Sequence, residues 1–209
     1  MVGEESPVEG NQTGLGNGGT DPGRRWGKAW ADGGTRGMSW TRQRHLARLR
    51  DVTSTWIARA DDFVPDDVAR ILAGLPEWFG IPEATAEYVA AARRLETWTV
   101  RQPGGEVAGV MLVERHFPHV AEIHLIATER RLRGRGVGRA LVAALETDAA
   151  ARGVRLLEVK TLAASHPDPG YAQTRLFYES VGFLPVEVTD LWGPTNPCLI
   201  MVKPLAAED

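Results

Sequence analysis

The stretch that decides the fold is "RRLRGRGVGRALV" (residues 130–142), in which three glycines alternate with other residues among five arginines. An apolar run, "AEIHLIAT" (121–128), precedes it, and apolar residues at helical spacing follow it. This order predicts a strand, a tight turn and a helix. Backbone N–H groups converge at a helix N-terminus, where the peptide dipoles add about half a positive charge. We therefore expect an anion to bind on this turn.

Composition sets broad limits on the class of protein. A chain of 209 residues suits one domain of ordinary size with a tail. The net charge of −3 does not point to nucleic acid or to an anionic membrane surface, so the arginine cluster is a local feature. A single cysteine, Cys198, excludes an intramolecular disulfide and is typical of a reducing compartment. No apolar run approaches the roughly 18 residues that span a bilayer, and we expect a cytoplasmic protein.

The chain divides into two regions of different composition. Residues 1–53 are polar, glycine-rich and aperiodic, which predicts a largely disordered N-terminal extension, whereas residues 54–205 have the pattern of one globular domain. Alternating and helical patterns predict the order β-α-α-β-β-β-α-β-α-β-β, an α/β fold with a mixed sheet. The predicted strands cover 54–60, 96–102, 105–116, 119–128, 154–162, 185–192 and 198–203. The predicted helices cover 64–75, 82–96, 137–152 and 171–183.

The spacing of the glycines separates the candidate phosphate-binding motifs. A dinucleotide fingerprint requires G-x-G-x-x-G, but counting from Gly134 places Arg139 where the last glycine belongs. Glu158, 20 residues after Gly138, has the separation of a ribose-binding acid but lies in the middle of a predicted strand. No G-K-[ST] follows, which excludes a Walker loop. A dinucleotide-binding enzyme is the least favoured of the functions considered.

Three segments together resemble the GNAT superfamily of acyl-CoA-dependent N-acyltransferases. Residues 133–138, "RGRGVG", match its pyrophosphate loop, [QR]-x-x-G-x-[GA]. "AEIHLIAT" is similar to its fourth strand, and "LFYESVGF" (176–183) to its late helix. The resemblance covers about residues 54–205 and is closest to a bacterial subgroup of unassigned substrate. It implies a mostly antiparallel sheet whose central strands splay apart, flanked by helices.

The same resemblance implies how acetyl-CoA binds as co-substrate. The pyrophosphate would lie on the backbone amides of Gly134, Arg135, Gly136, Val137 and Gly138, with charge from Arg133 and Arg135, since guanidinium groups match phosphate oxygens. The pantetheine arm would run along the fourth strand and contact the backbone of residues 125–127, namely Leu125, Ile126 and Ala127. An amide near Leu125 would polarise the thioester carbonyl. No metal is expected.

Catalysis of amine acylation needs a base and an acid. An alkylammonium has a pKa near 10, so a proton must leave as the amine attacks. Glu122 matches the position of the base in the histone-acetylating branch of the family and is the favoured candidate, acting through water. His124 has the better unperturbed pKa, and a mechanism without a protein base also stays open. Strict alternation places Glu122 and His124 on one face of the strand, opposite Ile123 and Leu125.

The remaining candidates concern the departing thiolate and the acceptor. Tyr178 occupies the family's general-acid position. Tyr171 stands where the family often has an asparagine that contacts pantetheine, so this helix departs from the family pattern. Trp78, Phe79 and Trp192 fall in loops that select the acceptor in such folds, together with His124. Their aromatic rings suit an apolar or cationic amine.

The leading hypothesis is an N-acetyltransferase that moves the acetyl group from acetyl-CoA to a primary amine by direct attack in a ternary complex. No cysteine lies in the motifs, which disfavours an acyl-enzyme. The alternative is a non-catalytic CoA-binding or sensor domain, which the retention of Tyr178 and Glu122 disfavours. The acceptor is a small molecule or a protein or peptide amine, with neither nucleic acid nor membrane as partner. A homodimer is compatible with the family.

Overall fold

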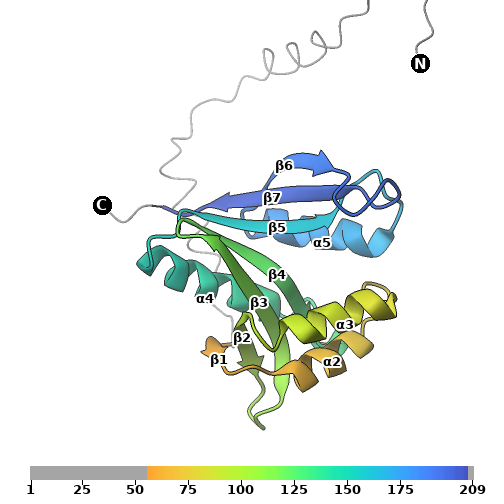
Figure 1. Ribbon diagram of the computed structural model, residues 1–209. Coiled ribbons are helices and arrows are strands. Elements are labelled where there is room, and N and C mark those ends of the chain that lie inside the picture. The colour runs from red at the N-terminus through yellow and green to blue at the C-terminus, as the bar shows by residue number, and fades with distance from the viewer. Residues whose placement is uncertain (1–55, 207–209) are drawn as a thin grey trace, which may run out of the picture. The chain divides into compact units, whose positions relative to one another are not determined.

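The computed structural model describes residues 56–206 of the chain (Figure 1). Within this range the strands are β1 (Ala58–Asp61), β2 (Glu96–Arg101), β3 (Val107–Phe117), β4 (Val120–Thr128), β5 (Leu156–Leu162), β6 (Leu184–Thr189) and β7 (Cys198–Pro204). The α-helices are α2 (Pro65–Ala73), α3 (Pro82–Ala91), α4 (Val137–Ala151) and α5 (Pro169–Ser180), and a 3-10 turn, Arg130–Leu132, precedes α4. The order of elements predicted from the sequence is confirmed.

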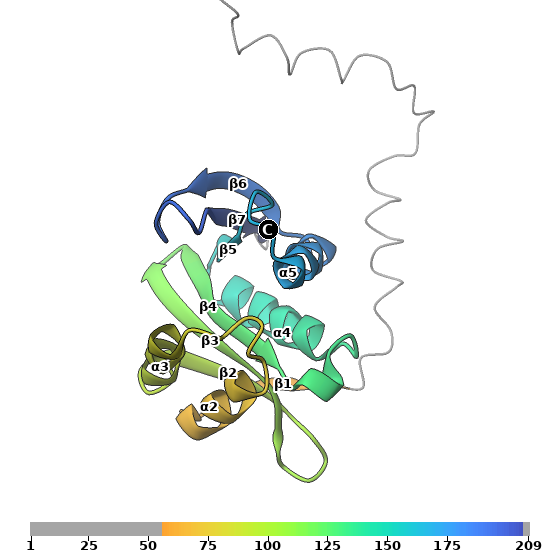
Figure 2. The ribbon, with the colours of Figure 1, turned by 90° about the vertical axis from the view of Figure 1, so that its right-hand side faces the viewer.

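The seven strands form one sheet in the order β1-β2-β3-β4-β5-β7-β6. Neighbouring strands are antiparallel except β4 and β5, which run parallel. Helices α2 and α3 cover one face of the sheet, and α4 and α5 cover the other (Figure 2). The fold is therefore the mixed, mostly antiparallel α/β sheet flanked by helices that was expected.

Local sequence explains where the helices begin and end. Helices α2 and α3 each start with proline, whose fixed φ suits the first helical position. The carboxylate of Asp168 caps α5 by accepting hydrogen bonds from the N–H groups of Gly170 and Tyr171. Gly153, at φ 75°, ends α4 as a left-handed glycine does. By contrast, the residue that precedes α4 is Gly136, which offers no side-chain cap.

Strand β4 contains a bulge at His124. Leu112 of β3 pairs with Leu125, but the next residue of β3, Val113, pairs with Ile123, so His124 is an extra residue in β4. As a result Ile123 packs in the core under α4, whereas Leu125 packs in the core under α2 and α3. The prediction that these two residues share a face is wrong, because it assumed unbroken alternation.

The central strands separate immediately after this bulge. Pairing between β4 and β5 ends at Ile123 and Val159, while β4 continues to pair with β3 as far as Thr128. The last five residues of β4, 124–128, therefore have no strand beside them on the β5 side. This opening leads directly to the glycine turn and α4.

The N-terminal extension predicted for residues 1–53 lies outside the described residues. Within residues 56–206, no helix is both long enough and apolar enough to cross a bilayer.

Candidate active site

Two glycines of the turn between β4 and α4 are required by their backbone angles. Gly134 has φ of 70° and Gly136 has φ of 90°, a region that other residues rarely adopt. Because Gly136 is the residue that precedes α4 and has no capping side chain, the first turn of the helix is left open. The turn thus has the geometry of an anion-binding helix N-terminus.

Not every amide of this turn is available to a ligand. The first bond within α4 runs from the N–H of Ala140 to the carbonyl of Gly136, at 3.0 Å. The N–H groups of Val137, Gly138 and Arg139 come before it and have no acceptor within the helix. The N–H of Arg135, however, donates to the carbonyl of Leu132 at 3.3 Å. The expectation that all amides of residues 134–138 bind the anion must therefore omit Arg135.

The third glycine, Gly138, allows close packing of α4 against α5. A Cβ there would lie 3.1 Å from Cζ of Phe177 on α5. On the other side of α4, a Cβ on Gly109 of β3 would lie 2.5 Å from Cγ1 of Val137. The second distance is shorter than carbon atoms tolerate, and the first is tighter than an ordinary contact, so the ring of Phe177 would have to shift. These two glycines bring the first turn of α4 close to α5 and to the sheet.

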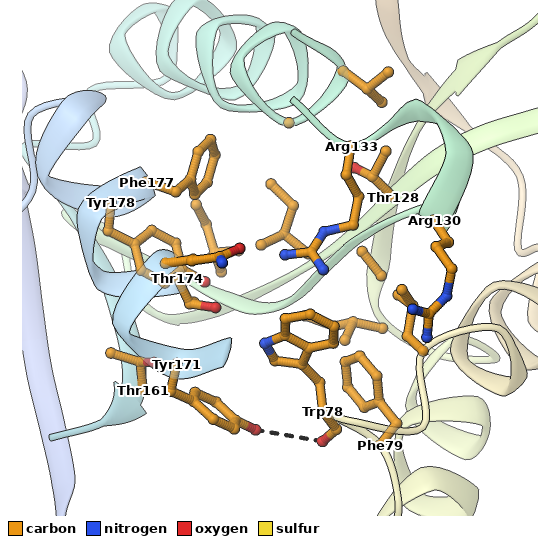
Figure 3. Close-up of a pocket in the computed structure, with 18 of the residues that line it drawn as sticks. Trp78, Phe79, Thr128, Arg130, Arg133, Thr161, Tyr171, Thr174, Phe177 and Tyr178 are labelled. Atoms are coloured by element: carbon orange, nitrogen blue, oxygen red, sulfur yellow. Dashed lines mark hydrogen bonds between the residues drawn. The ribbon is translucent and has the colours of Figure 1, made fainter. Parts of the chain in front are cut away.

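The arginines around the turn have different environments. The guanidinium of Arg133 lies 3.9 Å over the ring of Trp78 and points into the space beside α4 (Figure 3). Burial and the charge of Arg130 lower its pKa, but arginine stays protonated. Arg139 donates to the hydroxyl and carbonyl of Ser180 at 3.3 and 3.4 Å. Arg133 and Arg139 both line the cavity described next.

The other arginines of the motif face away from that cavity or toward its rim. Arg131 pairs with Glu129 and Glu106, at 2.9 and 3.2 Å. Arg130 lines the rim and pairs with Glu77 of the loop between α2 and α3. Arg135, which was predicted to bind the cofactor, is the member of the loop 133–138 that does not line the cavity.

A cavity of about 780 Å³ joins the glycine turn to the opening between β4 and β5. This volume is within the range of small-molecule sites. The cavity is lined by the turn and the first residues of α4, by α3, β4, β5 and α5, and by the loops between α2 and α3 and between β6 and β7. The lining includes Leu75, Trp78, Phe79, Tyr88, His124, Leu125, Ile126, Ala127, Thr128, Lys160, Thr161, Tyr171, Thr174, Phe177, Tyr178 and Trp192.

Trp78 connects three parts of this site (Figure 3). Its ring stacks on Arg133 and also lies against the start of α5, where a Cβ on Gly170 would be 3.0 Å from Cζ2 of the indole. The hydroxyl of Tyr171 donates to the carbonyl of Trp78 at 3.4 Å. Burial raises the pKa of Tyr171 to about 12, so it stays protonated. These contacts hold the loop between α2 and α3 to α5 across the cavity.

Glu122 is held by two hydrogen-bond donors. Its Oε2 accepts from Nζ of Lys160 and lies against Nε2 of His116, each at 2.6 Å. Burial alone would raise the pKa of this carboxyl, but the two partners outweigh burial and the pKa is lowered. Glu158 is a second partner of Lys160, at 2.7 Å. Glu122 is therefore a carboxylate committed to an ion pair, and it does not line the cavity.

His124 lies on the cavity wall beside Tyr88, with 5.5 Å between the ring centroids. Burial lowers the pKa of the imidazole, and the negative charges of Glu122 and Glu114 oppose this effect without cancelling it. A lowered pKa leaves His124 neutral at pH 7, with a ring nitrogen that accepts a proton.

Two hydroxyl groups lie deeper in the site, where β5 faces α5. Tyr178 is buried between Phe177 and Phe183 and lines the cavity, and burial raises its pKa, so it keeps its proton. Thr161 lies two residues after Val159, which is the last residue of β5 that pairs with β4. Its Oγ1 is buried and has no hydrogen-bond partner among the described residues. Such a group costs about 1–3 kcal/mol unless something pairs with it.

The cavity brings together most of the residues singled out in the sequence. Glu122 and Arg135 are the two predicted residues that do not line it. Those that do are Trp78, Phe79, His124, Leu125, Ile126, Ala127, Arg133, Gly134, Gly136, Val137, Gly138, Tyr171, Tyr178 and Trp192.

Lys160, Thr161 and Tyr88 also line the site but were missed in the sequence. For the first two a signal existed, because a lysine and a threonine interrupt the apolar strand "LLEVKTL". Tyr88 gave no such signal in its helix.

An open helix N-terminus with nearby arginines, continuous with a channel between splayed strands, suits a long ligand with an anionic end. Residues 66–183 match the model of the acetyltransferase (GNAT) family. The chain belongs to this family. Among curated proteins, none matches the sequence.

Solved structures share the fold. One is a GNAT-family protein from Desulfovibrio desulfuricans, with a TM-score of 0.64 and 20% identity over 73% of this chain and 100% of that one. The ribosomal-protein-S18-alanine N-acetyltransferase from Escherichia coli gives a TM-score of 0.57 and 20% identity, over 73% and 97%. An aminoglycoside 6′-N-acetyltransferase complexed with coenzyme A gives a TM-score of 0.58 and 20% identity, over 73% of this chain and 99% of that one.

Proposed function

We propose that this protein transfers an acetyl group from acetyl-CoA to a primary amine by direct attack within a ternary complex. The observation that carries the proposal is one continuous cavity. It runs from the open N-terminus of α4, past Tyr178, to His124 and the aromatic residues of the α2–α3 loop. Both substrates of an acyl transfer would meet in such a space.

The residues present fit acetyl-CoA. The N–H groups of Gly136, Val137, Gly138 and Arg139 would bind the pyrophosphate, with the charges of Arg133 and Arg139 beside them. The pantetheine arm would lie along residues 124–128, where β4 has no neighbour on the β5 side. The unpaired Oγ1 of Thr161 would donate to a polar group of that arm. The thioester carbon would then lie between β4 and Tyr178.

The contacts favour His124 over Glu122 as the base. Glu122 is ion-paired and its pKa is lowered, so it is a weak proton acceptor. His124 lines the cavity and is neutral at pH 7. In this proposal the amine nitrogen attacks the thioester carbon while its proton passes to His124. Glu122 acts on His124 through its charge, which favours the protonated imidazole that forms.

Tyr178 would complete the transfer. As the C–N bond forms, the C–S bond breaks and the thiolate takes the hydroxyl proton of Tyr178. The proton accepted by His124 leaves to solvent, and Tyr178 is reprotonated from solvent. Burial raises the pKa of this tyrosine, so it keeps its proton at neutral pH and cannot be the base, and its hydroxyl must be held against the sulfur to donate.

The acceptor would bind at the aromatic end of the cavity. Phe79 contacts Tyr88 edge to face, Tyr88 lies beside His124, and Trp192 also lines the cavity. The ammonium of Lys160 does not repel a cationic amine strongly, because Glu122 and Glu158 both pair with it. These surroundings suit an amine with an apolar or cationic body.

The proposal is tested by measuring CoA thiol release from acetyl-CoA with a panel of amines that covers alkylamines, polyamines, amino acids and peptides. Release that depends on one class of amine supports it. Tight CoA binding by calorimetry with no release on any amine would instead support the non-catalytic CoA-binding domain. A fluorescence titration with NADH in place of acetyl-CoA tests the dinucleotide alternative.

A further inference from the structure

Trp56 contacts the glycine turn from far away in the sequence. Its indole Nε1 donates a hydrogen bond to the carbonyl of Arg135 at 2.9 Å, across 79 residues. The ring is partly buried and packs on the hydrophobic core under α4. The indole is therefore fixed by packing, and it holds one specific peptide group of the turn.

That peptide group also carries an amide of the proposed anion site. In a trans peptide the C=O of Arg135 and the N–H of Gly136 point in opposite directions. Because the carbonyl is held toward Trp56, the N–H of Gly136 is directed away from it. Gly134 and Gly136, on either side of Arg135, both have positive φ, and glycine adopts many other backbone angles at little cost. A turn of this kind needs an outside contact to keep one peptide orientation.

A rotated peptide would reverse the dipole that faces the bound anion. Rotation of the unit between Arg135 and Gly136 would bring the carbonyl oxygen to the position of the N–H, and an oxygen dipole repels phosphate. If the ligand must first rotate the peptide back, its affinity is reduced by the free energy of that rotation. A peptide that is already held in the right orientation therefore favours binding.

We infer that Trp56 is a positioning residue, which presets the N–H of Gly136 for the pyrophosphate of acetyl-CoA through its hydrogen bond to Arg135. This inference rests on the proposed function, in which the turn binds that pyrophosphate. It adds to the site a residue that does not line the cavity and that no motif contains.

The test is Trp56→Phe in the full chain, which removes the indole N–H but keeps an aromatic ring on the core. We expect the Kd of CoA to rise about five- to tenfold, as for the loss of one hydrogen bond and of the order it imposes. S-acetyl-pantetheine ends before the pyrophosphate, so its kcat/KM should stay unchanged. A merely structural role would lower activity on both acyl donors in proportion, and that result would overturn the inference, as would an unchanged Kd of CoA.

Trp98→Phe is the matched control. Trp98 belongs to the same hydrophobic cluster, and its Nε1 donates to Glu96 at 2.9 Å, remote from the turn. It should not change the preference for acetyl-CoA over S-acetyl-pantetheine. A preference that changes equally in the two tryptophan variants contradicts a specific role for Trp56.

A measurement on the unaltered protein covers the case in which Trp56→Phe fails to fold. Hydrogen exchange of the Trp56 indole N–H can be followed by NMR. Its rate should fall when CoA binds and should not change with pantetheine. Equal rates with and without CoA would overturn the inference.

The substitution Gly136→Glu separates this inference from the proposed function. If it leaves CoA binding intact, the turn is not the pyrophosphate site and both ideas fail. If it abolishes CoA binding while Trp56→Phe binds CoA normally, the inference about Trp56 fails by itself.

Discussion

Replacing Thr161 by valine should make the protein more stable and its binding of acetyl-CoA weaker. Thr161 is 2% exposed, and its Oγ1 has no hydrogen-bond partner among the described residues. Valine has nearly the same shape and the same preference for strands. Removal of an unpaired buried hydroxyl should raise the free energy of unfolding by about 1 kcal/mol. For a domain of this size that corresponds to a Tm increase of about 2–4 °C.

The same substitution should weaken the binding of acetyl-CoA. If the hydroxyl pairs with the pantetheine arm, its loss leaves a polar group of the ligand unsatisfied, which costs about 1 kcal/mol and weakens affinity about fivefold. Thermal unfolding without ligand and calorimetry with acetyl-CoA measure the two effects separately. A lower Tm together with unchanged affinity would refute the reasoning.

Thr97→Val is the control for this substitution. Thr97 is also 2% exposed, but its hydroxyl donates to the carbonyl of Leu95 at 3.1 Å. The same chemical change should therefore lower the free energy of unfolding by about 1 kcal/mol and leave acetyl-CoA affinity unchanged.

Three further substitutions test the site. Glu122→Gln removes a charge that raises the pKa of His124, so that pKa should fall and the acidic limb of the kcat/KM profile should move to lower pH. If Glu122 is itself the base, the limb disappears instead. Tyr178→Phe keeps the packing on Phe183 and should lower kcat about 10²-fold with little change in acetyl-CoA affinity. An unchanged kcat would contradict the role of Tyr178 as the acid. Gly136→Glu puts bulk and negative charge at the open end of α4 and should abolish CoA binding in calorimetry, provided that circular dichroism shows an unchanged fold.

Much of the fold follows from local sequence. The periodicity of apolar residues predicts the order of strands and helices, because side chains alternate along a strand and repeat every 3.6 residues along a helix. The turn at 133–138 is equally local, since Gly134 and Gly136 adopt backbone angles that other residues disfavour. Gly138 belongs to the same motif for another reason, the ring of Phe177, which lies 39 residues further along the chain.

The roles of individual side chains in the site depended on the tertiary structure. An extra residue in β4 moves Leu125 to the opposite face from Ile123, and no spacing rule reveals a bulge in advance. The ion pair with Lys160, formed between neighbouring parallel strands, helps to lower the pKa of Glu122 against the effect of burial.

By itself the sequence determined the elements, the glycine turn and the family, because each depends on residues close together in the chain. Only the tertiary structure decided which arginine stacks on Trp78, which amide of the turn is already bonded and which buried hydroxyl lacks a partner among residues 56–206. Those properties depend on side chains that are distant in sequence and meet only when the sheet and its two helical layers assemble.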